Sequence, residues 1–321
     1  MAGQLGLRPT DKTRPVLRMG AHLRAAAFQA PASIDYAVKI DRWIVGANDR
    51  FGTCGPVSVA NFALLVSTVL GNAPFRATDD EVFDLYRRSG NPNFDGQTRN
   101  PDGSYVDDNG VDMTVMLSEL VKGGIGEGSR NVKALAFGRL DAYSTAEMWA
   151  AAAVFGGGLI GADLDRAQGD QFDAGTPWDY ASGSPDWGGH AMLAASRYTD
   201  AAGTLADRTS LVTWATLTDC TDAFIGRQVP EVYAVIWPWH LKDAGFLAGV
   251  DLAGVAAEYE ALTGRPFPAQ VPVSPAPNAA VDALSDFPWP DVEPWRTSPH
   301  IWRRATAAAK ALTGWKSRHG L

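Results

Sequence analysis

Cysteine is scarce in this sequence of 321 residues, which contains only Cys54 and Cys220. Two cysteines cannot build a disulfide-rich scaffold or a zinc site made mainly of thiolates. No apolar run approaches the ~18 residues that a membrane helix needs, and residues 1–18 lack the apolar core of a signal peptide. We therefore expect a chain that stays in the cytoplasm of the cell that makes it and has no membrane span.

Basic residues are also in deficit, because 28 lysines and arginines face 36 aspartates and glutamates, which leaves a net charge of −8. This balance argues against nucleic-acid binding by the body of the protein. The charge is unevenly distributed, since residues 296–321 hold six basic and no acidic side chains and the rest of the chain therefore carries −14. A hydrophobic content of 46% is enough for a packed core.

Helical signals dominate the first half of the chain and strand signals the second. An apolar stretch over 57–70 follows Cys54 and ends at Gly71, capping boxes begin at Thr78 and Ser144, and Asp112 is placed to cap another helix. Short β-prone runs come later, at 159–164, 191–198, 211–216 and 232–237. This segregation predicts an α+β fold with a helical lobe and a sheet lobe.

The composition also suggests where the chain divides. We expect an extended arm at 1–47 packed on the core, and a main domain at 48–264. Within the domain the helical lobe covers about 48–155, the sheet lobe about 156–245, and a further helix about 251–262. Proline recurs over 265–295, which indicates an extended linker, and a basic tail follows at 296–321.

Cys54 is the residue with the clearest chemical potential. A cysteine at a helix N-terminus has its pKa lowered by the unpaired amides and the helix dipole, which favours the nucleophilic thiolate. An imidazole usually completes the activation, and His190 is the best placed histidine because Gly188 and Gly189 precede it at the start of a predicted strand. The plain alternative is a buried structural thiol. By its context after two tryptophans, His240 is expected to be a packed residue.

Three blocks of the sequence resemble those of papain-like cysteine peptidases, in the order found in that family. They are the segments 48–56, 187–191 and 212–214, which contain Cys54, His190 and Trp214. More narrowly, the arm, the 108–112 loop and the Thr213-Trp214 pair are similar to papain-fold proteins encoded by phages and prophages of actinobacteria. The resemblance covers roughly residues 5–245 and does not include the tail.

This resemblance implies a role for each matched residue. Cys54 would be the nucleophile and His190 the general base that later protonates the leaving group. Asn48, six positions before Cys54, would offer its amide to the oxyanion together with the Cys54 backbone N–H. Trp214 would shield His190 from water. An Asn-Asp pair at 48–49 is also typical of a turn, and both interpretations of Asn48 can hold.

The sequence departs from the family pattern at the residue that orients the histidine, because Val212 stands where the family has asparagine. Thr213 or Asp219 would orient His190 instead, or a Cys-His pair alone would suffice. Ala215 replaces the glycine usual after the tryptophan, a change expected to narrow the cleft.

Two further features have a simpler interpretation. For 108–112 a turn and helix cap is preferred over a calcium loop, because the spacing does not give the EF-hand ligand series. Cys220 is expected in a loop, where Asp219 and Asp222 disfavour its thiolate, and is interpreted as a spectator.

The leading functional hypothesis is a phage-associated cysteine hydrolase that cleaves a peptide or peptidoglycan amide bond without a metal or cofactor. Because the narrower resemblance is to phage proteins and no inhibitory pro-segment is recognised, we expect a protein in or near a virion and not a secreted zymogen. The alternative is an inactive papain-fold structural or adaptor protein that docks to virion neighbours through its arms. Residues 287–315 would then contact the partner, with four aromatic anchors at Phe287, Trp289, Trp295 and Trp302.

Overall fold

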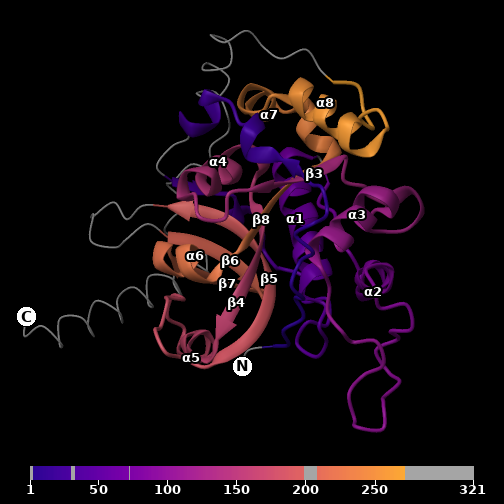
Figure 1. Ribbon diagram of the computed structural model, residues 1–321, viewed down its shortest axis with the longest axis vertical. Coiled ribbons are helices and arrows are strands. Elements are labelled where there is room, and N and C mark those ends of the chain that lie inside the picture. Colours follow the sequence, from indigo (N-terminus) through magenta and orange to yellow (C-terminus); the bar gives the residue numbers. More distant parts are fainter. Residues whose placement is uncertain (1–2, 30–32, 72, 199–207, 272–321) are drawn as a thin grey trace, which may run out of the picture.

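The computed structural model describes residues 3–29, 33–71, 73–198 and 208–271 (Figure 1). Most of the proline-rich linker, the basic tail and the four aromatic anchors expected in segment 287–315 lie outside the described residues. The expectations for these segments therefore stay predictions. Within the described ranges, no helix is both long enough and apolar enough to cross a membrane.

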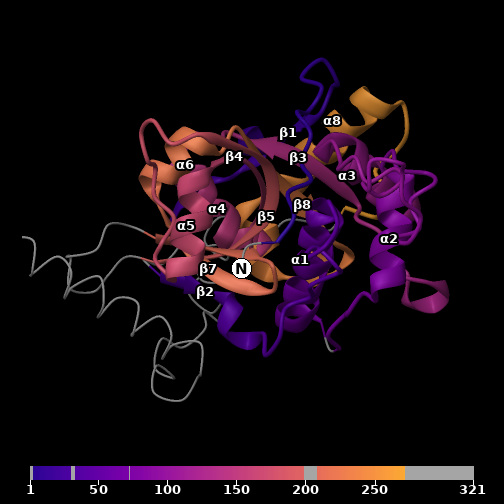
Figure 2. The ribbon, with the colours of Figure 1, turned by 90° about the horizontal axis from the view of Figure 1, so that it is seen from below.

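Three helices form the lobe on one side of the molecule (Figures 1 and 2). Helix α1 (Cys54–Leu70) is buried over most of its length, as its almost uninterrupted apolar sequence requires. Helix α2 (Asp79–Arg88) starts at the predicted capping box, in which Thr78 and Glu81 bond each other's backbone N–H. Helix α3 (Met113–Gly123) is capped by the Asp112 carboxylate, as predicted.

The other lobe is built on an eight-stranded sheet in the order β1-β3-β8-β4-β5-β6-β7, with β2 pairing separately with β5. All neighbours are antiparallel except β1 and β3. The strands are β1 (Leu17–Arg18), β2 (Ser33–Asp35), β3 (Ala136–Leu140), β4 (Gly158–Asp165), β5 (Asp186–Tyr198), β6 (Arg208–Thr213), β7 (Thr216–Thr221) and β8 (Glu231–Ile236).

Shorter elements surround this sheet. The remaining helices are α4 (Thr145–Phe155), α5 (Arg166–Ala174), α6 (Asp222–Gln228), α7 (Ala244–Gly249) and α8 (Leu252–Thr263). The 3-10 turns are η1 (Met19–His22), η2 (Ala25–Gln29), η3 (Tyr36–Lys39), η4 (Gly128–Arg130) and η5 (Pro238–Lys242). Helices α5 and α6 lie on the side of the molecule opposite α2 and α3 (Figures 1 and 2). The sequence patterns predict α4 and α8 but not α5, α6 or α7, each of which is short.

Four local predictions are corrected by the structure. Strand β5 begins at Asp186, so His190 lies inside the strand and not at its start. The run 211–216 is not one strand, because Trp214 and Ala215 have φ angles of 45° and 56° and form the turn between β6 and β7. Cys220 lies in β7 and not in a loop. Ser144 caps α4, but the Glu147 carboxylate bonds Asp141 N–H, so that capping box is incomplete.

The N-terminal region is more structured than an extended arm. It contributes β1 and β2 to the sheet and contains the three 3-10 turns η1 to η3. Ile34, Tyr36 and Trp43 are buried, so this region supplies part of the core. Short segments of this kind have no helical periodicity, which is why the sequence pattern misses them.

Candidate active site

Cys54 is the first residue of α1 and is almost fully buried, with 1% of its surface exposed. The helix has no side-chain cap, and the Thr53 hydroxyl donates to the Gly46 carbonyl oxygen at 2.9 Å. The amides at the start of α1 are therefore free to face the sulfur, where they lower the thiol pKa. Burial outweighs them and raises the pKa of Cys54 to about 11.

The strand that carries His190 lies directly against the start of α1. The backbone N–H of Ala191 donates to the Cys54 sulfur at 3.4 Å. Ser58, one turn along α1, has its hydroxyl oxygen 2.8 Å from the Cys54 carbonyl oxygen and 3.0 Å from that of Ala191. Ser58 therefore ties the helix to the strand beside the sulfur. Sequence reasoning missed this residue, since nothing distinguishes it from other serines in helices.

His190 is fully buried and is held from one side of its ring. Its Nε2 lies 2.7 Å from the Thr213 hydroxyl, whereas its Nδ1 has no hydrogen-bond partner among the described residues. Burial lowers the pKa of His190 to about 3, so the imidazole is neutral at neutral pH. Of the two orienting residues proposed, the structure brings Thr213 to the histidine. The Asp219 carboxylate instead accepts from the Ser210 hydroxyl at 2.7 Å.

Trp214 covers the face of the His190 ring. The two rings are stacked with centroids 4.8 Å apart and planes inclined by 30°. The turn between β6 and β7 presents Trp214 in this position, with Trp214 and Ala215 in the left-handed backbone region. Two L-residues in that region are strained, and such strain is often found at functional sites. This location suits the shielding role that the sequence predicted.

Asn48 is buried beside the same site and performs two tasks. Its Nδ2 donates to the Phe51 carbonyl oxygen at 2.9 Å, which holds the loop that leads to Cys54. The same amide donates to the Gln4 carbonyl oxygen at 3.1 Å. Gly46 and Ala47 both have positive φ angles, and Asn48 N–H bonds the Val45 carbonyl oxygen, which makes a tight turn before it. Asn48 therefore lies in a tight turn, and its side-chain amide also donates to a carbonyl oxygen of the N-terminal segment.

The space in front of Cys54 is filled by the protein's own N-terminal segment, which we call the cleft segment and define as residues 3–10. It runs between β5 and the start of α1, as the indigo trace shows (Figures 1 and 2). Leu7 N–H donates to the Gly189 carbonyl oxygen at 3.0 Å, and Arg8 N–H to that of Val111 at 2.8 Å. Val111 N–H donates to the Gly6 carbonyl oxygen at 2.8 Å. The cleft segment thus bridges the two lobes at Leu7, through isolated β-bridges to Val111 and Gly189.

Gly6 is the residue of the cleft segment that lies beside the Cys54 sulfur. Its backbone N–H contributes to lowering the pKa of the thiol. The sequence shows no recognisable inhibitory pro-segment, yet residues 3–10 occupy the cleft in this structure. Glycine, glutamine and leucine at 3–7 carry no sequence signal of an inhibitor, which explains why it was missed.

The loop at 108–112 supports the wall of the cleft. The Asp108 carboxylate accepts from Gly52 N–H at 2.9 Å and from the Tyr86 hydroxyl at 2.8 Å. Asp112 caps α3 with one oxygen and accepts from Asp11 N–H at 3.0 Å with the other. Both carboxylates are thus used by donors of the protein itself, as a turn and helix cap requires. No group of three metal-ligating side chains occurs in the described ranges.

Two other chemically active side chains are structural. Cys220 is buried, and burial, with Asp219 as the next cause, raises its pKa well above the usual value. His240 is the packed residue that its context predicted. Its Nδ1 accepts from Trp237 N–H at 3.0 Å, and its Nε2 lies 3.2 Å from the Phe155 carbonyl oxygen.

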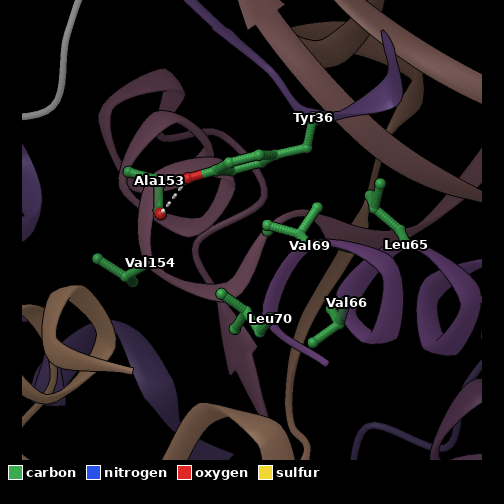
Figure 3. Close-up of a pocket in the computed structure, with 8 residues that line it drawn as sticks. Tyr36, Leu65, Val66, Val69, Leu70, Ala153 and Val154 are labelled. Atoms are coloured by element: carbon green, nitrogen blue, oxygen red, sulfur yellow. Dashed lines mark hydrogen bonds between the residues drawn. The ribbon is translucent and has the colours of Figure 1, made fainter. Parts of the chain in front are cut away.

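A small apolar pocket lies far from this chemistry (Figure 3). It is formed where the C-terminal half of α1 meets α4 and η3, and the Tyr36 hydroxyl points to the Ala153 carbonyl oxygen, 3.4 Å away. Cys54 lies at the opposite end of α1. The pocket is lined by Tyr36, Leu65, Val66, Val69, Leu70, Ala153, Val154 and Gly156. Its one titratable lining side chain is Tyr36, whose pKa burial raises well above the usual value, so the candidate active site is the Cys54 cleft.

Comparison with solved structures shows the fold. The crystal structure of xylellain, a cysteine protease from Xylella fastidiosa, matches with a TM-score of 0.55 and 11% sequence identity, covering 73% of this chain and 96% of that chain. Procathepsin B S9 from Trypanosoma congolense matches with a TM-score of 0.52 and 10% identity, covering 73% and 86%. No protein-family model matches the sequence, and no curated protein does. The chain has the papain-like two-lobed α+β fold, as predicted.

Proposed function

We propose that the protein is a cysteine hydrolase that cleaves a peptide or peptidoglycan amide bond through Cys54 and His190. One observation carries the proposal: the Cys54 sulfur, at the N-terminus of α1, accepts the N–H of the residue that follows His190. The start of α1 and the strand that carries His190 thereby meet at the sulfur. The papain-like fold supports the same function, since it is a fold of known cysteine proteases.

In the proposed reaction, Nδ1 of His190 takes the thiol proton of Cys54, and the sulfur attacks the carbonyl carbon of the amide. The Asn48 amide and the Cys54 N–H stabilise the oxyanion. The imidazolium then returns its proton to the leaving amine as the C–N bond breaks, which leaves a thioester. Water, deprotonated by His190, hydrolyses the thioester and regenerates the thiol. Thr213 holds the ring in place from Nε2.

The cleft segment must leave before this reaction can begin. In the conformation described here it bonds Gly189, Val111 and Asn48, and its Gly6 N–H lies beside the sulfur. Its departure would admit water, and the burial that raises the pKa of Cys54 and lowers that of His190 would be relieved. The two pKa values would then approach each other, which favours proton transfer from thiol to imidazole.

The alternative is a catalytically inactive papain-fold protein with a structural or adaptor role in a phage virion. The filled cleft and the neutral, buried Cys54 and His190 favour it. Its docking would use the terminal arms, including segment 287–315. Incorporation into a virion is part of this proposal and also of the phage association proposed for the hydrolase.

The test uses the full chain with Leu7→Pro, which removes the N–H that bonds Gly189, in a Cys220→Ala background so that Cys54 is the only thiol. Iodoacetamide labelling and hydrolysis of casein and peptidoglycan are measured with and without His190→Ala. We expect Cys54 to label faster than a free thiol at pH 7, and both labelling and hydrolysis to be lost with His190→Ala. Labelling no faster than that of a free thiol, with no hydrolysis, would favour the structural protein.

A further inference from the structure

The passage beside Cys54 is walled by backbone on two sides at Gly6. A Cβ atom added to Gly6 would lie 2.1 Å from the Gly52 carbonyl oxygen. A Cβ atom added to Gly110 would lie 2.2 Å from the Gly6 carbonyl oxygen and 3.1 Å from the Gly6 α-carbon. The α-carbon at this point is therefore enclosed between two stretches of main chain, with no room for a side chain.

These walls are anchored, so they cannot simply move apart. Gly52 N–H is bonded to the Asp108 carboxylate. Gly110 N–H donates to the Tyr86 hydroxyl at 2.8 Å, and its carbonyl oxygen accepts from Asn91 Nδ2 at 3.0 Å. The φ angle of Gly110 is +71°, a conformation that glycine adopts without strain. Both walls thus belong to one buried polar network.

The residues on either side of Gly6 do have room for side chains, and each of these side chains lies over a glycine. The side chain of Leu7 rests on β4 at Gly161, where an added Cβ atom would lie 2.7 Å from Leu7 Cδ2. The side chain of Leu5 lies over Gly188, where the corresponding distance to Leu5 Cδ1 is 3.2 Å. Both leucines pack against the hydrophobic core. The cleft therefore accommodates an apolar residue, a glycine and another apolar residue in succession.

We propose that the cleft selects peptides with glycine beside Cys54 and an apolar residue on each side of that glycine, and that Leu5-Gly6-Leu7 is an internal occupant with the same pattern. This inference rests on the proposed function, because it treats the cleft as a substrate site.

The first test asks whether the passage excludes a side chain. Gly6→Ala is compared with Gly226→Ala, a glycine in α6 with no atom within 4 Å of an added Cβ. Both are made in the full chain with Cys220→Ala, and thermal melting verifies folding. Because overpacking against fixed backbone expels the segment, we expect Gly6→Ala to raise the iodoacetamide labelling rate of Cys54 by at least about tenfold. Equal labelling of the two variants would overturn the inference.

The second test supplies the occupant as a separate molecule. Acetyl-Leu-Gly-Leu-amide and acetyl-Leu-Ala-Leu-amide are added to the Gly6→Ala chain, and protection of Cys54 from labelling is measured. We expect the glycine peptide to protect at a concentration at least about tenfold lower. Equal protection would overturn glycine selection.

Hydrolysis of longer peptides that contain the same two triplets separates this inference from the proposed function. Preferential protection without cleavage by the Leu7→Pro chain would support glycine selection and contradict the hydrolase. Equal cleavage of the glycine and alanine peptides would support the hydrolase and contradict glycine selection.

Discussion

The hydroxyl oxygen of Thr213 lies 2.7 Å from Nε2 of His190, on the side of the ring away from the nitrogen left without a partner. A hydroxyl group both donates and accepts, so Thr213 holds the ring in position without selecting its tautomer. It also brings no negative charge to stabilise an imidazolium. In the proposed reaction, Thr213 would therefore supply position only, and the rest of the cleft would have to stabilise the charge that develops.

Thr213→Val tests this contact. The substitution removes the hydrogen-bond partner of a buried imidazole nitrogen, so we expect the free energy of unfolding to fall by about 1–3 kcal/mol. In the Leu7→Pro chain, we also expect the Cys54 labelling rate to fall by about tenfold, because the ring is no longer held. Urea unfolding and iodoacetamide labelling measure the two effects. Thr213→Ser keeps the hydroxyl and is expected to stay near wild type; a Ser variant as impaired as the Val variant would contradict the argument.

Ser58→Ala removes the hydroxyl that links α1 to β5 beside Cys54 and Ala191. Two buried carbonyl groups share this donor, so we expect a loss of about 1–3 kcal/mol in unfolding free energy. Ser118→Ala is the matched control, because its hydroxyl bonds only the Thr114 carbonyl oxygen within α3 and is partly exposed. The control is expected to cost less than about 0.5 kcal/mol. Similar urea midpoints for both variants would show that Ser58 does not hold the lobes together.

Ala215→Gly is expected to stabilise the protein. Its φ angle of 56° places an L-residue in the left-handed region, which costs about 1 kcal/mol that glycine does not incur. We therefore expect the melting temperature to rise. Ala257→Gly, in α8, is expected to have the opposite sign, because a helix interior disfavours glycine by about 1 kcal/mol. A fall in melting temperature for Ala215→Gly would mean that the methyl group contributes packing that outweighs the strain.

Acid is expected to destabilise the fold through its two fully buried histidines. Burial lowers the pKa of both His190 and His240 to about 3, against 6.5 for an unperturbed histidine. Below pH 6.5 the unfolded chain therefore binds protons at these histidines that the folded chain does not bind. The contribution of these two neutral histidines to the free energy of unfolding is complete above pH 6.5 and is lost as the pH falls toward 3. We expect about 2 kcal/mol of loss per histidine between pH 7 and pH 5.

Urea unfolding at pH 7, 6 and 5 measures this loss. His190→Gln removes one of the two titrating groups, so the decline with pH is expected to be about half as steep as in the wild-type chain. An unchanged slope in that variant would show that His190 is accessible to protons in the folded state.

Much of the fold was predictable because its signals are local. Helix α1 follows from an apolar run that begins at Cys54 and stops before Gly71, and the caps at Thr78 and Asp112 are side-chain bonds within a few residues. The elements that were missed are short or, like β1, lie within the arm and pair with distant strands. Whether such a short segment forms a helix or a strand depends on the distant segments it packs against, which its own hydrophobic periodicity does not reveal.

Part of the candidate site was likewise predictable from the sequence, and part was not. The order of Cys54, His190 and Trp214 along the chain is enough to propose a papain-like pair, and the matches to solved structures confirm that fold. The choice between Thr213 and Asp219 is not contained in the sequence. The two residues are six positions apart on β6 and β7. The pairing of these strands places Asp219 opposite Ser210, whose hydroxyl bonds the aspartate, whereas Thr213 contacts His190.

The sequence by itself determined the class of fold and the candidate nucleophile, because a helix start and a cysteine at that start are encoded by neighbouring residues. Only the tertiary structure decided that the cleft is filled by residues 3–10, that Ser58 joins the lobes and that glycine alone fits beside Cys54. Each of these depends on contacts between segments roughly 50 to 200 residues apart. Such contacts are set by how the two lobes pack, and local sequence patterns do not record them.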